Sequence, residues 1–230
     1  MIPFPGATTV LRWVGVFLVI AVLGASPVAQ GQVEVNPGIK AGVNFASFGG
    51  EDTEQFFQGA DEQFRTGVIL GGFVEVDPPG PFALQTELLY VQKGSKAEGT
   101  VSGETVTGID KINYIEVPLL AKWQIPVTGP LTPNLFAGPA VGVPVSATSE
   151  IEGSGGSSST DIDELIKPTD VGMHIGAGLD VATGTVEVML DVRYQFGLST
   201  ILRGDNKSLR NMGIEEIKNR GVGITAGLSF

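Results

Sequence analysis

The sequence lacks cysteine altogether, and His174 is the only histidine among its 230 residues. A chain without cysteine forms no disulfide bond and has no thiolate metal site, cysteine nucleophile or lipidated N-terminal cysteine. One histidine excludes a metal site built from several histidines. Basic residues are scarce as well, 14 against 25 acidic ones, and the formal charge of -11 argues against nucleic acid as a partner. Charged residues make up 17% and hydrophobic residues 42%, which excludes a chain that is disordered throughout.

Long apolar runs are missing except near the N-terminus. Residues 13–23 form an unbroken apolar run, well short of the roughly 20 residues that a transmembrane helix needs. One basic residue precedes this run and small residues follow it, which is typical of a secretory signal peptide. We therefore predict a cleaved signal over residues 1–31 and a single domain over residues 32–230, with a membrane anchor as the alternative. The candidate cleavage sites are Ala25, Ala29 and Gly31.

The remaining chain repeats one pattern, in which apolar residues occupy every second position until glycine, proline or Asx residues interrupt them. A period of two predicts β-strands. Eight segments show it: residues 38–48, 66–76, 82–94, 111–125, 134–147, 171–181, 185–198 and 221–230.

The connections between these segments alternate in length. Short turns cover residues 77–81, 126–133 and 182–184, whereas long loops cover residues 49–65, 95–110, 148–170 and 199–220. Tight periplasmic turns and long extracellular loops are typical of outer-membrane β-barrels. The sequence therefore predicts an all-β protein, an eight-stranded antiparallel up-and-down transmembrane β-barrel with four long extracellular loops. An even number of strands places both ends of the domain on the periplasmic side.

Apart from Lys111, the first residue of its segment, charged side chains fall on only one face of every predicted strand. Arg or Lys facing lipid at the bilayer midplane would cost about 2–4 kcal/mol, so the uncharged apolar face must be the one that faces lipid. A water-soluble barrel would place its apolar face inside instead. Four aromatic residues near segment ends are expected at the membrane interfaces: Tyr90, Trp123, Tyr194 and Phe230.

An eight-stranded barrel has an interior only wide enough for side chains, and charges buried there need partners. We therefore predict a paired charge network in the lumen, with Glu116 near Lys122 and Arg193 near Glu187 or Asp191. His174 is expected to be a hydrogen-bonded lumen residue rather than a catalytic base. The predicted network comprises Lys40, Glu75, Glu87, Glu116, Lys122, His174, Asp180, Glu187, Asp191 and Arg193.

The loops contain most of the acidic surplus. Acidic residues crowd residues 49–65 and 148–170, and the second loop includes a polar tract, Gly153–Thr160 (GSGGSSST), that we expect to be flexible. These loops are expected to be solvated; an alternative is that they bind divalent cations that bridge loops or lipopolysaccharide. The loop over residues 199–220 is rich in Lys and Arg and is expected to pair with the acidic loops or contact phosphorylated lipid. Residues 208–218 have a helix-like pattern.

Several stretches match a known family in order along the mature chain: residues 38–48, 87–94, 114–123, 136–143, 170–180, 193–201 and 222–230. They include YIEVPLLAKW at 114–123, VGMHIGAGLD at 171–180 and the terminal VGITAGLSF. The chain resembles the outer membrane protein β-barrel domain of the PorT-like family, of the Bacteroidetes type. The resemblance implies an outer-membrane location and the barrel fold. It also implies that the C-terminal Phe230 acts as a signal for the barrel assembly machinery.

The predicted function is non-enzymatic and needs no cofactor. We expect a monomeric outer-membrane protein with a structural or surface-interaction role, in contact with membrane lipid and lipopolysaccharide and open to a protein partner through its extracellular loops. Three alternatives remain: a PorT-like accessory barrel in protein secretion, a narrow pore, and a lipid-modifying enzyme that would use His174.

Overall fold

The computed structural model describes residues 33–53, 57, 60–101, 103–203, 213–214 and 216–230. The predicted signal peptide (1–31) lies outside these residues, as do positions 208–212 and 215 of the helix predicted over 208–218. Lys218, the last residue of that predicted helix, is instead the first residue of a β-strand, Lys218–Ser229. Among the described helices, none has the length and apolar character to span a membrane.

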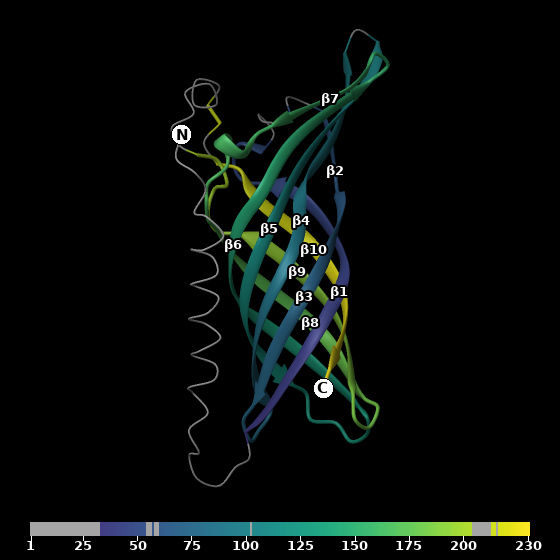
Figure 1. Cartoon of the computed structure of the whole chain (residues 1–230), viewed down its shortest axis with the longest axis vertical. Coiled ribbons are helices and arrows are strands. Elements are labelled where there is room, and N and C mark those ends of the chain that lie inside the picture. The colour runs from purple at the N-terminus through teal and green to yellow at the C-terminus, as the bar shows by residue number, and fades with distance from the viewer. Residues whose placement is uncertain (1–32, 54–56, 58–59, 102, 204–212, 215) are drawn as a thin grey trace.

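Eight long antiparallel strands form the body of the protein (Figure 1). Each strand pairs with the next along the barrel, and the last strand pairs with the first, so that the sheet closes on itself. This confirms the predicted eight-stranded up-and-down barrel. The strands are β1 (Glu34–Gly49), β3 (Arg65–Asp77), β4 (Phe82–Val101), β5 (Glu104–Gln124), β6 (Leu131–Gly153), β8 (Asp170–Ala182), β9 (Glu187–Gly197) and β10 (Lys218–Ser229).

Closure of the barrel depends on the pairing of β1 with both β3 and β10. The register with β10 runs from Gly38 opposite Ser229 to Gly49 opposite Lys218. Because the ladder is continuous, the barrel leaves no strand edge in the membrane, where an unpaired backbone group would cost several kcal/mol. Glycine permits the closest strand contacts: a Cβ atom at Gly138 would lie 1.9 Å from the Leu119 carbonyl oxygen.

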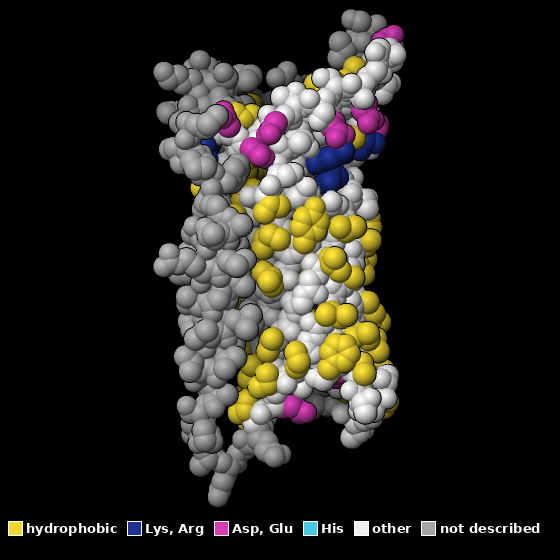
Figure 2. All heavy atoms as spheres, in the orientation of Figure 1, with side chains coloured by type: hydrophobic (Ala, Val, Ile, Leu, Met, Phe, Trp, Pro, Cys, Tyr) yellow, Lys and Arg dark blue, Asp and Glu magenta, His cyan; other side chains and the backbone are white. Residues whose placement is uncertain are grey.

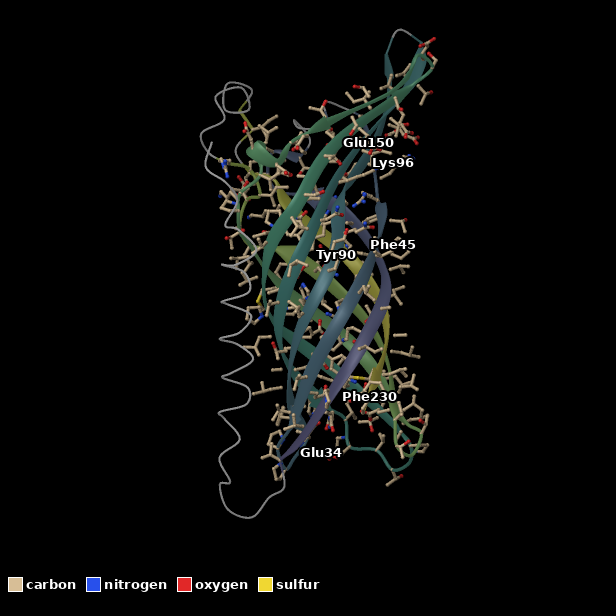
Figure 3. All side chains as sticks on the ribbon, in the orientation of Figure 1. Glu34, Phe45, Tyr90, Lys96, Glu150 and Phe230 are labelled. Carbon is tan, nitrogen blue, oxygen red and sulfur yellow. The ribbon has the colours of Figure 1, made fainter. Side chains whose placement is uncertain are left out.

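The outer surface of the barrel is a band of hydrophobic side chains (Figure 2). Ile39, Leu70 and Leu84 are each more than half exposed, as lipid-facing residues should be. Trp123 and Phe230 are exposed as well, and Figure 3 places Phe230 near the end of the barrel that carries the short turns. Within the membrane band, charged side chains of the same strands, such as Lys40, Glu87 and Arg193, point inward and are buried. The apolar-out and polar-in assignment is therefore correct.

Two of the four predicted long loops are in fact β-structure. Residues 95–110 are the paired ends of β4 and β5, and residues 148–161 are the paired end of β6 and the short strand β7 (Gly156–Asp161). These residues lack large apolar residues at every second position, but Thr and Val, which favour strands, occur in residues 95–110, and the ladder continues beyond the barrel. The tract Gly153–Thr160, predicted to be flexible, forms a tight hairpin whose backbone pairs with β6.

Together these strand ends form an extension that we call the β-arm. It projects from one end of the barrel, opposite the end where Glu34 and Phe230 lie (Figures 1 and 3). A three-residue strand, β2 (Asp61–Gln63), pairs with the β4 strand of the β-arm and forms the edge of the sheet opposite β7. The β-arm comprises residues 61–63, 95–101, 104–111, 147–153 and 156–161.

Candidate functional site: the charged lumen and the β-arm

The middle of the lumen is crossed by a compact ion-pair cluster. Lys40 of β1 contacts Glu87 of β4 at 2.7 Å and Asp191 of β9 at 2.9 Å. Arg193 donates two hydrogen bonds to the Glu87 carboxylate, at 2.6 and 3.1 Å, and lies 3.2 Å from Asp191. Two cations and two carboxylates from three strands thus neutralise one another. Gln85 adds a hydrogen bond of 2.5 Å to Glu87.

A second cluster lies toward the short turns. Lys122 of β5 contacts Glu75 of β3 at 2.6 Å and Asp180 of β8 at 3.3 Å. Asn134 donates to Asp180 at 2.8 Å, and Lys122 reaches Gln85 at 3.5 Å. Gln85 therefore links this cluster to the middle one.

A third cluster lies toward the β-arm end. Glu116 of β5 contacts the Nε2 atom of His174 at 2.6 Å and the Lys93 ammonium at 2.8 Å. The Lys93 ammonium also lies over the Tyr114 ring, 5.2 Å from its centroid. His174 is buried in this cluster and does not reach the lipid face.

The individual pairings differ from those expected from the sequence. Lys122 does not pair with Glu116, because the two are six residues apart on one strand, which separates them by about 20 Å. Arg193 contacts Asp191 but not Glu187, which begins β9 and is only half-buried. The other nine residues of the predicted network all lie in the three clusters.

Three participants were missing from the predicted network: Lys93, Gln85 and Asn134. Lys93 shares a strand face with Glu87, so alternation alone indicates that it points inward. The two amides have no charge and therefore gave no signal in a search for charged residues.

An apolar cap covers the lumen at the β-arm end. Its side chains come from β1, β5 and β6 and from the loops that follow β7 and β9, and each is at least nine-tenths buried: Phe48, Ile112, Tyr114, Ala147, Ile166, Ile201, Leu202, Ile214 and Ile217. The loops are joined by backbone hydrogen bonds, from Lys167 N–H to the Ile201 carbonyl and from Ile201 N–H to the Ile217 carbonyl, both 2.8 Å. The cap is therefore an ordered apolar cluster.

Below the cap, Asn219 donates hydrogen bonds to the Tyr114 hydroxyl at 3.0 Å and to the Asp170 carboxylate at 2.8 Å. Next to these groups is a cavity of about 10 Å³, the size of one water molecule. His174 and Gln195 line this cavity, and the His174 Nδ1 and Gln195 Oε1 atoms are buried without a hydrogen-bond partner within the described residues. The site fits a single bridging water.

The β-arm has a free edge at β7. Ile162 N–H, just after β7, bonds to the Ala147 carbonyl at 3.0 Å, and the ladder continues outward in register as far as Gly156 opposite Gly153. Because inward and outward backbone groups alternate in an antiparallel ladder, the N–H and C=O groups of Ser157, Ser159 and Asp161 point away from β6. In the described part of the chain no strand pairs with this side of β7.

The β-arm is strongly acidic, with eight acidic and two basic residues. Both basic residues are paired, Lys96 with Glu98 at 2.8 Å and Lys111 with Glu150 at 2.5 Å. Burial raises the pKa of the Asp110 carboxyl, and a hydrogen bond from Ser149 opposes this rise without cancelling it. No group of three or more metal-ligating side chains occurs within the described ranges, so the divalent-cation alternative has no candidate site there.

These features define a closed transmembrane β-barrel with a filled lumen and an extended sheet beyond one end. The family profile described as "Outer membrane protein beta-barrel domain" matches residues 28–203, and the chain belongs to this family. Its place is accordingly the bacterial outer membrane. A search of curated proteins gives no match.

Several solved structures are similar at low identity. Neisserial surface protein A is 12% identical, with 86% of this chain and 99% of that chain covered and a TM-score of 0.46. Ail, the attachment invasion locus protein of Yersinia pestis, is 14% identical over 86% and 99% of the two chains, with a TM-score of 0.42. The N-terminal β-barrel domain of Pseudomonas aeruginosa OprF is 14% identical over 87% and 100%, with a TM-score of 0.29.

Proposed function

We propose that this protein is a sealed, non-catalytic and monomeric outer-membrane barrel that holds the β-arm outside the cell for interaction with a surface partner. The observation that supports this proposal is the contrast between the two ends of the molecule. The lumen is filled by ion pairs and capped by apolar side chains, while strand pairing continues into an arm beyond the membrane band. A rigid barrel is a suitable base for such an arm because it fixes the arm's position.

The pore and lipid-enzyme hypotheses fit this lumen less well. A pore needs a continuous water path, but three clusters cross the lumen and the cavity beneath the cap holds about one water. A lipid enzyme that uses His174 needs this side chain at the lipid face, whereas it is buried against Glu116. The secretion-accessory hypothesis, which comes from the PorT-like resemblance, stays a prediction and expects a secretion defect on deletion.

Two further partners belong to the proposal. The apolar band is expected to contact membrane lipid and lipopolysaccharide, and the barrel assembly machinery is expected to read the C-terminal Phe230. The Phe230 side chain is exposed, and its N–H bonds to the Pro37 carbonyl at 2.9 Å, which ties the end of the chain to β1. Export by the predicted signal peptide precedes both steps.

The test is a variant without the arm. Residues 98–107 and 150–159 are each replaced by Asn-Gly, which forms a two-residue hairpin between hydrogen-bonded positions of the ladder, Ala97 with Gly108 and Ser149 with Thr160. Cells with the full-length protein, the arm-less variant or no protein are compared for adhesion to one another and to matrix-coated surfaces.

We expect the arm-less variant to reach the outer membrane and to run as a compact unboiled band, yet to adhere like cells without the protein. Equal adhesion by the arm-less and full-length forms, with both at the surface, would contradict the proposal.

A further inference from the structure

We infer that the free edge of β7 is a docking site for an extended, basic segment of a partner protein, which binds by adding one strand to the β-arm. This inference rests on the proposed surface-interaction role. The occupant is defined by three properties of the edge: its outward hydrogen-bonding groups, its lack of protection and its acidic surroundings.

The edge offers a regular row of backbone groups. Ser157, Ser159 and Asp161 have their N–H and C=O groups directed away from β6, and all six residues of β7 are exposed. Six strand residues span about 20 Å, which is enough to pair with a segment of similar length. Strand addition at an exposed sheet edge is a common mode of peptide recognition, in which main-chain hydrogen bonds supply affinity and alternate side chains supply specificity.

This edge also lacks the usual protection. Exposed edges are commonly blocked by Lys, Pro, a β-bulge or a very short strand. β7 (GSSSTD) contains neither Lys nor Pro, and its pairing with β6 has no register shift. The opposite edge of the β-arm is protected, because β2 is only three residues long.

Charge selects the occupant. Glu152 and Glu150 lie opposite Ser157 and Ser159 in the ladder, so their side chains share one face with Asp161. Glu150 is paired with Lys111, whereas neither Glu152 nor Asp161 forms an ion pair with any described residue, and Asp161 accepts one hydrogen bond, from the Asp163 N–H at 2.9 Å. A strand added to β7 would therefore place alternate Lys or Arg side chains beside Asp161 and, across the small Ser157, within reach of Glu152 on β6.

A second copy of this chain is the wrong occupant for the same reason. Pairing β7 with another β7 would bring the acidic β-arms, with eight acidic and two basic residues each, against one another. Like charges placed opposite each other on a sheet are destabilising.

The other face of the sheet defines the remaining positions of the partner strand. Ile151 of β6 is 56% exposed, and its neighbour on β7 is the small residue Ser158. A partner side chain that alternates with the basic ones would reach over Ser158 and cover Ile151. The fitting segment therefore alternates Lys or Arg with Val, Ile or a similar apolar residue.

The experiment measures binding of a defined peptide to the full-length mature protein in phosphatidylcholine nanodiscs. The probe is a fluorescent, acetylated and amidated peptide of alternating Lys and Val, with empty nanodiscs subtracted. Two matched peptides are compared with it: the same sequence with alternate backbone nitrogens methylated, and alternating Glu and Val. We expect saturable binding of the Lys-Val peptide only.

Variants of the edge separate strand addition from charge attraction. Ser159→Pro removes an outward donor and leaves pairing with β6 intact, so it should weaken binding about tenfold or more. Ser159→Ala keeps the N–H and should bind like the wild type. Glu152→Gln with Asp161→Asn should weaken binding roughly fivefold at low salt and less at high salt.

Three results would overturn the inference: no saturable binding to the wild type, equal binding of the N-methylated peptide, or unchanged binding to Ser159→Pro. If the peptide fails while arm-less cells still lose adhesion, the edge inference is wrong and the proposed function stands. If arm-less cells adhere normally, the proposed function fails whatever the peptide does.

Discussion

Replacement of Arg193 by Met tests whether the lumen clusters stabilise the barrel. Arg193 is fully buried and provides three of the contacts that neutralise Glu87 and Asp191. Methionine fills much of the same volume, so the change removes charge rather than creating a large cavity. Lys40 alone would then face two buried carboxylates. Removing one partner from a buried ion pair costs about 3–5 kcal/mol, and we expect a loss of that size in the free energy of unfolding.

The assay is urea unfolding of the folded protein in phospholipid vesicles, followed by the unboiled band on a gel. Lys96→Met is the matched control, because the Lys96–Glu98 pair is about one-third exposed and should change stability by less than about 1 kcal/mol. Combining Arg193→Met with Glu87→Gln should cost less than the sum of the two, by about 0.5–3 kcal/mol. Equal stability of Arg193→Met and Lys96→Met would refute the stabilising network.

Three other substitutions test the close strand contacts, the β-arm and assembly. Gly138→Ala forces a Cβ atom against the Leu119 carbonyl and should destabilise the barrel by about 1–3 kcal/mol or more, whereas Gly108→Ala meets nothing within 4 Å and should have little effect on the same urea midpoint. Burial raises the pKa of Asp110, so its contribution to stability is largest below the ordinary pKa of about 3.9 and is lost as pH rises through the folded value. Asp110→Asn should therefore increase hydrogen-exchange protection of the β4–β5 hairpin at neutral pH but not at acid pH, and equal protection at neutral pH would contradict this. Phe230→Ser should lower the amount of protein in the outer membrane without preventing refolding in detergent; an unchanged amount would argue against its role as the assembly signal.

The barrel was predictable because lipid imposes a strict alternation on each strand. Large residues such as Ile39 and Leu84 repeat every second position on the outside, and charged residues take the inside. The β-arm lacks this signal because it lies beyond the membrane band. In residues 104–111 the two apolar residues, Val106 and Ile109, fall on opposite faces among polar residues, so neither face is apolar and the segment resembles a loop.

The partners within the lumen were less predictable than its inward faces. Alternation reports which side of a strand a residue occupies, but it does not report height along the barrel axis. That height depends on the stagger between strands, which sets Glu116 beside Lys93 and His174 rather than beside Lys122. The cap was hidden for a similar reason, because its residues come from segments far apart in the sequence, such as Phe48 and Ile217.

Planar bilayer recording of the full-length folded protein in concentrated KCl tests the central claim, a sealed lumen, most directly. The protein is added until insertion is confirmed by recovery of the compact unboiled band from the same lipid. The account predicts a membrane current indistinguishable from that of the protein-free bilayer. Reproducible steps of uniform conductance that scale with the amount of inserted protein would show an open water path through the ion-pair clusters and the cap, and would contradict it.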